Sequence, residues 1–284
     1  MRLLIATLVA LALLAPAAAA ADRPILLVHG YGDAAEGKDC NGSTWKPALR
    51  YFQDAGGRER SSLATVGYYA GDTHCDVTVG KASNERPIQD IARGLADYVD
   101  SRGEPVDIIA HSMGGLIARV ALLGSAQGWE GFPPKLDVDN VVTLSTPHQG
   151  VANPSAHDDR QWQQMRAGSG FLARLHERGS GLGDAWAAGT DWSLVGSKED
   201  ATVRYGSGID EGHHADQKFG YRDDAGDSGE VTHTGVRTLF GGNRYGLTYS
   251  HASGDHPPHH TDRGWSPLEV AFQAASRDGD GLPN

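Results

Sequence analysis

One serine in this sequence lies in a setting that favours nucleophilic chemistry. Ser112 stands in the run Ile109–Gly115 (IAHSMGG), directly after the apolar segment Val106–Ala110 and before an apolar helical segment. At such a tight strand-to-helix turn, a serine has a strained backbone and its hydroxyl projects above the sheet edge. The turn tolerates only small residues two places away, here Ala110 and Gly114. The other interpretation is that Ser112 only caps the helix, as serines at helix starts commonly do.

The surrounding segments predict the scaffold that would position this serine. Short apolar runs, typical of strands buried on both faces of a sheet, alternate with segments of helical periodicity. We expect strands at Ile25–Val28, Ala64–Tyr69, Val106–Ala110, Val141–Leu144, Trp192–Val195 and Phe219–Tyr221, and helices at Trp45–Asp54, from about residue 84 to 102, at Met113–Leu123 and at Ser266–Ala275. This order predicts an α/β domain with a largely parallel central sheet and helices on both faces.

Four stretches of the chain resemble secreted α/β-hydrolases of the lipase and esterase type, similar to small bacterial lipases with an A-H-S-M-G elbow. They are ILLVHGYG, AHSMGG, VVTLSTPHQG and SKEDATV, and the matching region runs from Ile25 to about Thr234. The resemblance implies the α/β-hydrolase fold. It also implies a serine ester hydrolase that needs no cofactor and acts on lipid or other apolar acyl esters.

Attack by Ser112 on an ester would create an oxyanion, and fixed backbone N–H groups stabilise that charge because they need not reorganise. The residue after the nucleophile, Met113, supplies one N–H at the start of its helix. The resemblance assigns the second donor to Tyr31, in the glycine-rich loop His29–Gly32 after the first strand. The alternative for this loop is a glycine turn without a catalytic role.

A carboxylate is needed to orient the base, and in this fold it follows the serine along the chain. The strand expected at Trp192–Val195 leads into Ser197–Val203 (SKEDATV). Related lipases carry an aspartate at the position of Asp200, so the resemblance assigns the acid to Asp200. The neighbouring Glu199 is the alternative.

The base should be a histidine that follows the acid. Among the 13 histidines, His233 follows the strand expected at Phe219–Tyr221, and we predict that it is the base. His148 precedes the acid, so we expect it to order a loop beside the site. His213 and His214 follow Asp200 too closely to leave room for a strand between them.

Between about residues 150 and 190 the strand–helix pattern changes to short helical segments that we expect outside the sheet. The resemblance to lipases implies a lid or acyl-binding cap here, with Phe171, Leu172 and Leu175 as apolar contacts for substrate. Ordinary core packing of a short helix is the alternative interpretation for these three side chains.

The C-terminal segment, residues 241–284, is polar and rich in glycine and histidine apart from its expected short helix, so we place the catalytic domain at residues 21–240. The histidines of the HPPHH run at 256–260 invite a metal interpretation. Two prolines prevent a regular helix there, however, and no suitably spaced partner completes a site. We predict a solvated segment and no metal.

The N-terminus has the pattern of a secretory signal peptide, with Arg2, the apolar run Leu3–Leu14 and small residues up to Ala21. We expect residues 1–20 to be removed and the protein to be secreted. The apolar run is too short for a bilayer, which needs about 20 residues. No second long apolar run follows, so we expect no membrane-spanning segment after cleavage.

The two cysteines, Cys40 and Cys75, are expected to form one disulfide, as an even pair in an exported protein usually does. Closing that loop contributes about 4 kcal/mol in the chain-entropy model. Two free, buried thiols are the alternative.

Composition restricts the partners. The chain carries 25 basic and 36 acidic side chains, and its formal net charge of −11 excludes attraction to a phosphate backbone. We expect a monomer that binds a lipid or small ester, in contact with a lipid surface but not with nucleic acid. The same elbow would also suit a thioesterase or an acyltransferase. A secreted binding protein on a hydrolase scaffold is the non-catalytic alternative.

Overall fold

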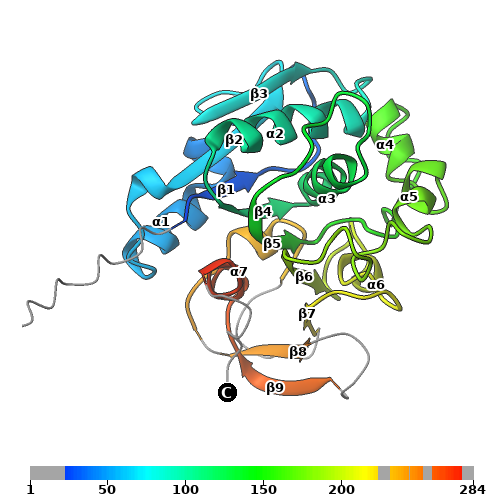
Figure 1. Ribbon diagram of the computed structural model, residues 1–284. Helices are drawn as coiled ribbons and strands as arrows, with labels where there is room; N and C mark the ends of the chain where they lie inside the picture. Colours follow the sequence, from blue (N-terminus) through cyan, green and yellow to red (C-terminus); the bar gives the residue numbers. More distant parts are fainter. Residues whose placement is uncertain (1–22, 223–230, 243, 252–257, 277–284) are drawn as a thin grey trace, which may run out of the picture.

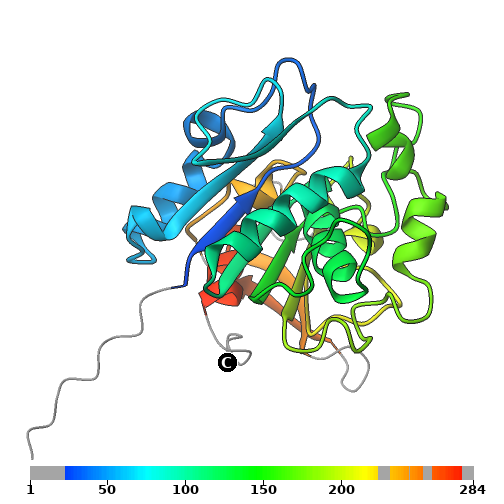
Figure 2. The ribbon, with the colours of Figure 1, turned by 45° about the horizontal axis from the view of Figure 1, so that its top comes forward.

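The structure is a computed structural model of the 284-residue chain, and it describes residues 23–222, 231–242, 244–251 and 258–276. Within these ranges the strands form one central sheet with helices on both of its faces (Figures 1 and 2). The predicted signal peptide, residues 1–20, lies outside the described residues. None of the described helices has both the length and the apolar character needed to span a bilayer.

The sheet has the strand order β3-β2-β1-β4-β5-β6-β7-β8-β9. Its strands are β1 (Ile25–Val28), β2 (Leu63–Tyr69), β3 (Val77–Ala82), β4 (Val106–His111), β5 (Val138–Leu144), β6 (Asp191–Ser197), β7 (Gln217–Tyr221), β8 (Tyr245–His251) and β9 (His259–Gly264). Neighbours from β3 to β7 are parallel, whereas β8 and β9 are antiparallel additions at one edge. The largely parallel α/β architecture predicted from the sequence is therefore confirmed.

The longer helices cover the two faces of this sheet because its strands are apolar on both sides. The α-helices are α1 (Lys46–Asp54), α2 (Ile88–Arg102), α3 (Met113–Ala126), α4 (Arg160–Gln164), α5 (Gly170–Leu175), α6 (Tyr205–Gly208) and α7 (Pro267–Ser276). Leu26 and Val28 of β1 pack in one core with α2 and α3, while Ile25 and Leu27 pack in a second core with α1 and α7. The alternation of side chains along a strand thus places β1 at the centre of both cores.

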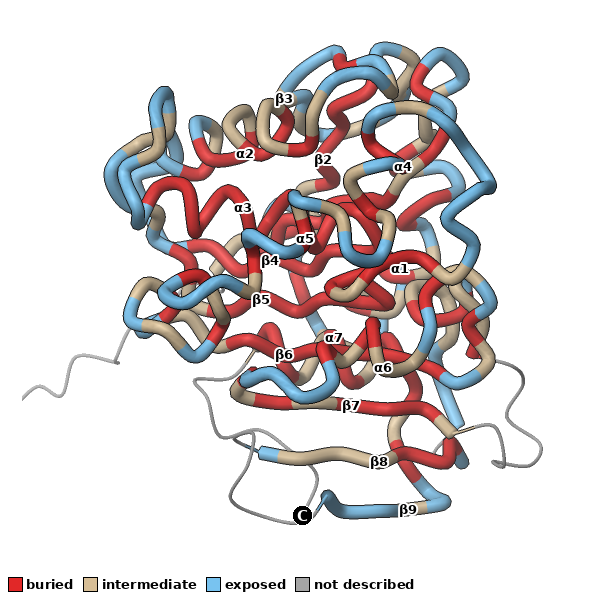
Figure 3. The backbone as a smooth tube through the Cα atoms, turned by 90° about the vertical axis from the view of Figure 1, so that its right-hand side faces the viewer, coloured by how far each residue is buried: buried red, intermediate tan, exposed pale blue. Residues whose placement is uncertain are grey.

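The strands at the sheet edges differ from the sequence prediction. The sequence indicates no strand at β3, β8 or β9, and it places residues 241–284 in a polar C-terminal segment with a short helix, outside a catalytic domain at 21–240. Instead, β8 and β9 extend the central sheet, and α7 packs in the same core as β1 and β4. In Figure 3 the backbone of β9 is mostly exposed and that of β8 partly so. A strand that faces water needs no apolar run, so the polar sequence of β9 does not predict a strand.

The predicted disulfide between Cys40 and Cys75 is present, with a Cα–Cα distance of 4.9 Å. It lies beside a backbone bridge between Asp39 and Thr73. Together they join the segment after β1 to the loop between β2 and β3.

The insertion at residues 150–190 contains α4 and α5, which lie together at one side of the sheet (Figure 1). Gln161 of α4 anchors it: its amide accepts a hydrogen bond from Tyr69 (2.6 Å) and donates to the carbonyls of Ser83 and Arg86. Leu172 and Leu175 of α5 are 3% and 1% exposed and belong to the core. These two side chains therefore pack in the core, as the alternative interpretation expects, because they are too buried to contact a substrate in this conformation.

Candidate active site

The turn between β4 and α3 holds Ser112 in a strained conformation, with φ 54° and ψ −126°. The helix starts so close to β1 that a Cβ on Gly114 would lie 2.5 Å from the carbonyl oxygen of His29. Gly30 is equally constrained, since its Cβ would lie 2.6 Å from that of Ser112. Small residues at these positions let the elbow and the loop after β1 meet. The Ser112 side chain makes no capping hydrogen bond to α3, which argues against the simple helix-cap interpretation.

Three side chains predicted from the sequence meet at this turn. The Nε2 atom of His233 lies 3.0 Å from the Oγ of Ser112, and the Nδ1 atom of His233 lies 2.7 Å from a carboxylate oxygen of Asp200. Asp200 follows β6, and His233 precedes a short 3₁₀ helix. With Nδ1 donating to the carboxylate, Nε2 is left as an acceptor that faces the serine hydroxyl.

The carboxylate of Asp200 is buried and held in place from two sides. Its other oxygen accepts hydrogen bonds from the backbone N–H groups of Thr202 (2.8 Å) and Val203 (2.9 Å). Burial alone would raise the pKa of Asp200, but the hydrogen bonds from His233 and the backbone outweigh it and lower that pKa. Asp200 is therefore ionised at neutral pH and fixes the tautomer of the histidine.

The alternative acid, Glu199, has a different partner. Its carboxylate accepts a hydrogen bond from the backbone N–H of Val231, two residues before His233. It thus holds the histidine loop through the main chain, and among the described residues the carboxylate that hydrogen-bonds to the imidazole is that of Asp200.

A second histidine supports the first, and no sequence pattern indicated it. The Nε2–H of His111 donates to the backbone carbonyl of His233 at 2.7 Å, and the two rings are 4.7 Å apart. Burial and the neighbouring His233 lower the pKa of His111, so its imidazole stays neutral. His111 is adjacent to Ser112, so one short segment contacts the histidine both at its ring and at its backbone.

The loop after β1 is fixed by a buried network centred on His29. Its Nε2 atom donates to Asp72 at 2.9 Å, and its ring stacks on Tyr68 at 4.1 Å. The hydroxyl of Tyr68 lies 2.9 Å from the carbonyl oxygens of both His29 and Gly30. Burial works to raise the pKa of Asp72, but hydrogen bonds from His29 and the backbone lower it overall, which keeps the carboxylate charged.

The two predicted oxyanion donors, the backbone N–H groups of Tyr31 and Met113, belong to the residues that directly follow Gly30 and Ser112, which lie in close contact. Among the described residues neither N–H has a hydrogen-bond acceptor, so both are available to a ligand. The side chain of Tyr31 turns to the insertion instead: its hydroxyl donates to Asp159 (2.5 Å) and its ring contacts Trp162. The insertion therefore touches the same residue whose main chain borders the site.

The other histidines considered from the sequence have partners other than Ser112 and Asp200. His148 is fully buried and contacts Arg119 (3.2 Å), and burial lowers its pKa to about 3. His213 stacks on His176, and His214 pairs with Asp216. None of them contacts Ser112 or Asp200 through a hydrogen bond within the described part of the chain.

Comparison with known proteins identifies the family to which this chain belongs. Residues 19–168 match the PGAP1-like alpha/beta domain, which is more than half of the chain. The chain belongs to the PGAP1-like alpha/beta domain family. No curated protein matches the sequence of this PGAP1-like chain.

Solved structures are similar to this PGAP1-like chain in fold. Aspergillus fumigatus lipase B has a TM-score of 0.52 and 16% identity, over 76% of this chain and 49% of that chain. Bacillus licheniformis lipase BlEst2 in mature form has a TM-score of 0.47 and 15% identity, over 68% of this chain and 81% of that chain. The chain thus spans about half the length of the Aspergillus lipase. The shared feature is the α/β-hydrolase fold, as the sequence predicts.

Proposed function

We propose that the protein is a serine carboxylic-ester hydrolase with Ser112 as nucleophile, His233 as general base and Asp200 as the acid that orients the base. The observation that carries this proposal is the line of two short hydrogen bonds from Ser112 to His233 to Asp200, at a strained strand-to-helix turn. A strained backbone at a residue with a base in reach is typical of a reactive centre.

In the proposed reaction, the Oγ of Ser112 attacks the ester carbonyl carbon while Nε2 of His233 accepts the hydroxyl proton. The carbonyl oxygen becomes an oxyanion that accepts hydrogen bonds from the backbone N–H groups of Tyr31 and Met113. His233 then gives its proton to the departing alcohol, which leaves an acyl group on Ser112. Water, deprotonated by the same imidazole, releases the acid and restores the serine.

We further propose that the substrates are lipid or other apolar acyl esters. Support comes from the similarity in fold to a lipase and from the insertion, which reaches the site through Tyr31 and Trp162. Phe171 on α5 is partly exposed and is the one of the three predicted apolar contacts that remains available to a substrate. We also propose secretion, which the signal-peptide pattern and the disulfide support.

Replacing the nucleophile tests the proposed chemistry. We expect Ser112→Ala to lower kcat for p-nitrophenyl butyrate by at least about 10⁴-fold, because no other group can form the acyl-enzyme. The control is Ser155→Ala, at an exposed serine of the insertion, which should leave kcat unchanged. Turnover by folded Ser112→Ala at the wild-type rate would refute the proposal.

A series of p-nitrophenyl esters from acetate to palmitate tests the substrate class. We expect kcat/KM to rise with acyl length as apolar surface is buried. Equal values along the series would contradict the lipid proposal while leaving the serine mechanism intact. A thioester turned over faster than its matched oxygen ester would instead favour a thioesterase.

A further inference from the structure

A cluster of three side chains lies where the insertion meets the connection between α6 and β7. His176 caps the C-terminal end of α5, Asp210 follows α6, and His213 precedes β7. One ligand atom from each lies within 4.8 Å of the other two. We propose that this His–Asp–His cluster is a binding site for a divalent transition metal, with Zn²⁺ as the expected ion.

The orientation of His176 supports this proposal. Its Nδ1 atom lies 2.9 Å from the carbonyl oxygen of Leu172 and donates to it. Its Nε2 atom faces the carboxylate of Asp210, at 2.9 and 3.1 Å from the two oxygens. Metal-binding histidines typically donate their other ring N–H to a carbonyl, which aims the free nitrogen at the ion. Either a proton or a metal ion can lie between this nitrogen and the carboxylate, and the nearby imidazole of His213 is the further ligand that favours the metal ion.

The carboxylate of Asp210 is held rigidly in position. Arg119 donates to one oxygen (3.1 Å), and Gln149 donates to the other (3.1 Å). Asp210 is fully buried, and its backbone has φ 47°, a conformation that only a well-determined surrounding maintains. Carboxylate ligands of metals are commonly fixed in this way by hydrogen bonds from neighbouring residues.

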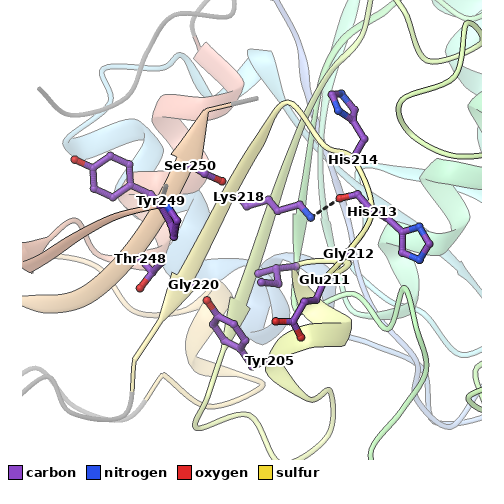
Figure 4. Close-up of a pocket in the computed structure, with 12 residues that line it drawn as sticks. Tyr205, Glu211, Gly212, His213, His214, Lys218, Gly220, Thr248, Tyr249 and Ser250 are labelled. Atoms are coloured by element: carbon purple, nitrogen blue, oxygen red, sulfur yellow. Dashed lines mark hydrogen bonds between the residues drawn. The ribbon is translucent and has the colours of Figure 1, made fainter. Parts of the chain in front are cut away.

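His213 gives the cluster access to solvent. Its ring lies 4.3 Å from that of His176, and its side chain is exposed. Lys218 of β7 donates to the carbonyl of His213 and so fixes its backbone. In Figure 4 the His213 imidazole points away from the rings of Tyr205 and Tyr249, which border a cavity of about 580 Å³. An ion can therefore enter from the solvent side of the buried carboxylate.

The ligand set indicates the type of ion. Two imidazoles and one carboxylate suit Zn²⁺, and a fourth tetrahedral position would remain for water. The nearby cations Arg119 and Lys218 oppose a dication, so we expect weaker binding than in a site with several thiolates or carboxylates. A bound ion would link α5 of the insertion to the α6–β7 connection and stabilise their packing.

Two adjacent histidines provide a matched test of the site. We expect purified wild-type protein to retain one equivalent of Zn²⁺ after dialysis, measured by elemental mass spectrometry, and to show a higher Tm with Zn²⁺. His213→Ala should weaken Zn²⁺ binding by at least about tenfold in titration calorimetry and abolish the Tm increase. His214→Ala should behave as wild type, because His214 pairs with Asp216 outside the cluster.

Other histidines are tested in the same experiment. The double variant His259→Ala/His260→Ala, on the exposed strand β9, should also bind Zn²⁺ as wild type does. Absence of stoichiometric binding by the wild-type protein would overturn the proposal. Equal affinity of His213→Ala and His214→Ala, or loss of binding in the β9 variant alone, would overturn it as well. None of these readouts depends on hydrolytic activity.

Discussion

Replacing Asp200 by asparagine separates the orienting role of the carboxylate from its role in the fold. The amide oxygen of Asn can still accept the hydrogen bonds from Thr202 and Val203, now 2.8 and 2.9 Å long. The amide NH₂ then takes the place of the oxygen that faces His233 at 2.7 Å. Because an NH₂ group donates, it favours the histidine tautomer with a bare Nδ1 and a proton on Nε2.

That tautomer cannot accept the proton of Ser112. In serine enzymes the corresponding change lowers kcat about 10⁴-fold. At about 1.4 kcal/mol for each factor of ten, this is about 5.5 kcal/mol of transition-state stabilisation. The free energy of unfolding should change far less, because the size of the side chain and two of its hydrogen bonds are kept.

The matched control for Asp200→Asn is Glu199→Gln, which also replaces a carboxylate by an amide in the same loop. We expect it to lower kcat less than about tenfold, since Glu199 contacts only the backbone of Val231 near the histidine. Both variants are measured by p-nitrophenyl butyrate hydrolysis, with urea denaturation to verify folding. A larger loss in Glu199→Gln than in Asp200→Asn would refute the assignment of the acid.

Further predictions concern the loop after β1, the sheet and the disulfide. Gly30→Ala should lower kcat by about 10²-fold, because its Cβ would lie 2.6 Å from that of Ser112 and displace the oxyanion loop; unchanged kinetics would contradict the close packing. Burial raises the pKa of Asp107 from 3.8 to about 6, so the folded protein keeps this proton at a pH where the unfolded chain has released it. The free energy of unfolding should therefore fall by up to about 3 kcal/mol as the pH rises from about 4 to about 6. In Asp107→Asn the free energy of unfolding, measured by urea denaturation, should depend less on pH in this range. The same pH dependence as in the wild type would rule out a contribution from Asp107. The double variant Cys40→Ser/Cys75→Ser should lose about 4 kcal/mol of stability, and equal urea midpoints with and without the disulfide would disprove this.

The scaffold was predictable where burial imposes a pattern on the sequence. Strands such as β1 and β4 are covered on both faces, so they require apolar runs that are easily recognised. The edge strands β3 and β9 carry exposed positions along much of their length, and their polar residues resemble those of loops. Strand β8, next to β9, is buried only at its start. Their position in the sheet depends on pairing with a neighbour, which a local pattern does not record.

The site was predictable to the extent that it is local. The elbow around Ser112 is one short segment whose small residues are required by its own geometry. The choice between Glu199 and Asp200 depends on which of two adjacent carboxylates faces His233, and only the tertiary structure distinguishes them. The pairs His29–Asp72 and Arg119–Asp210 are 43 and 91 residues apart, so no spacing in the sequence could indicate them.

The most direct test of the account is covalent labelling of the protein by a fluorophosphonate, followed by peptide mass spectrometry. The account predicts one adduct, on the peptide that contains Ser112, and much slower labelling of His233→Ala because the hydroxyl has lost its base. A folded wild-type protein that stays unlabelled, or that carries the adduct on a different residue, would contradict it.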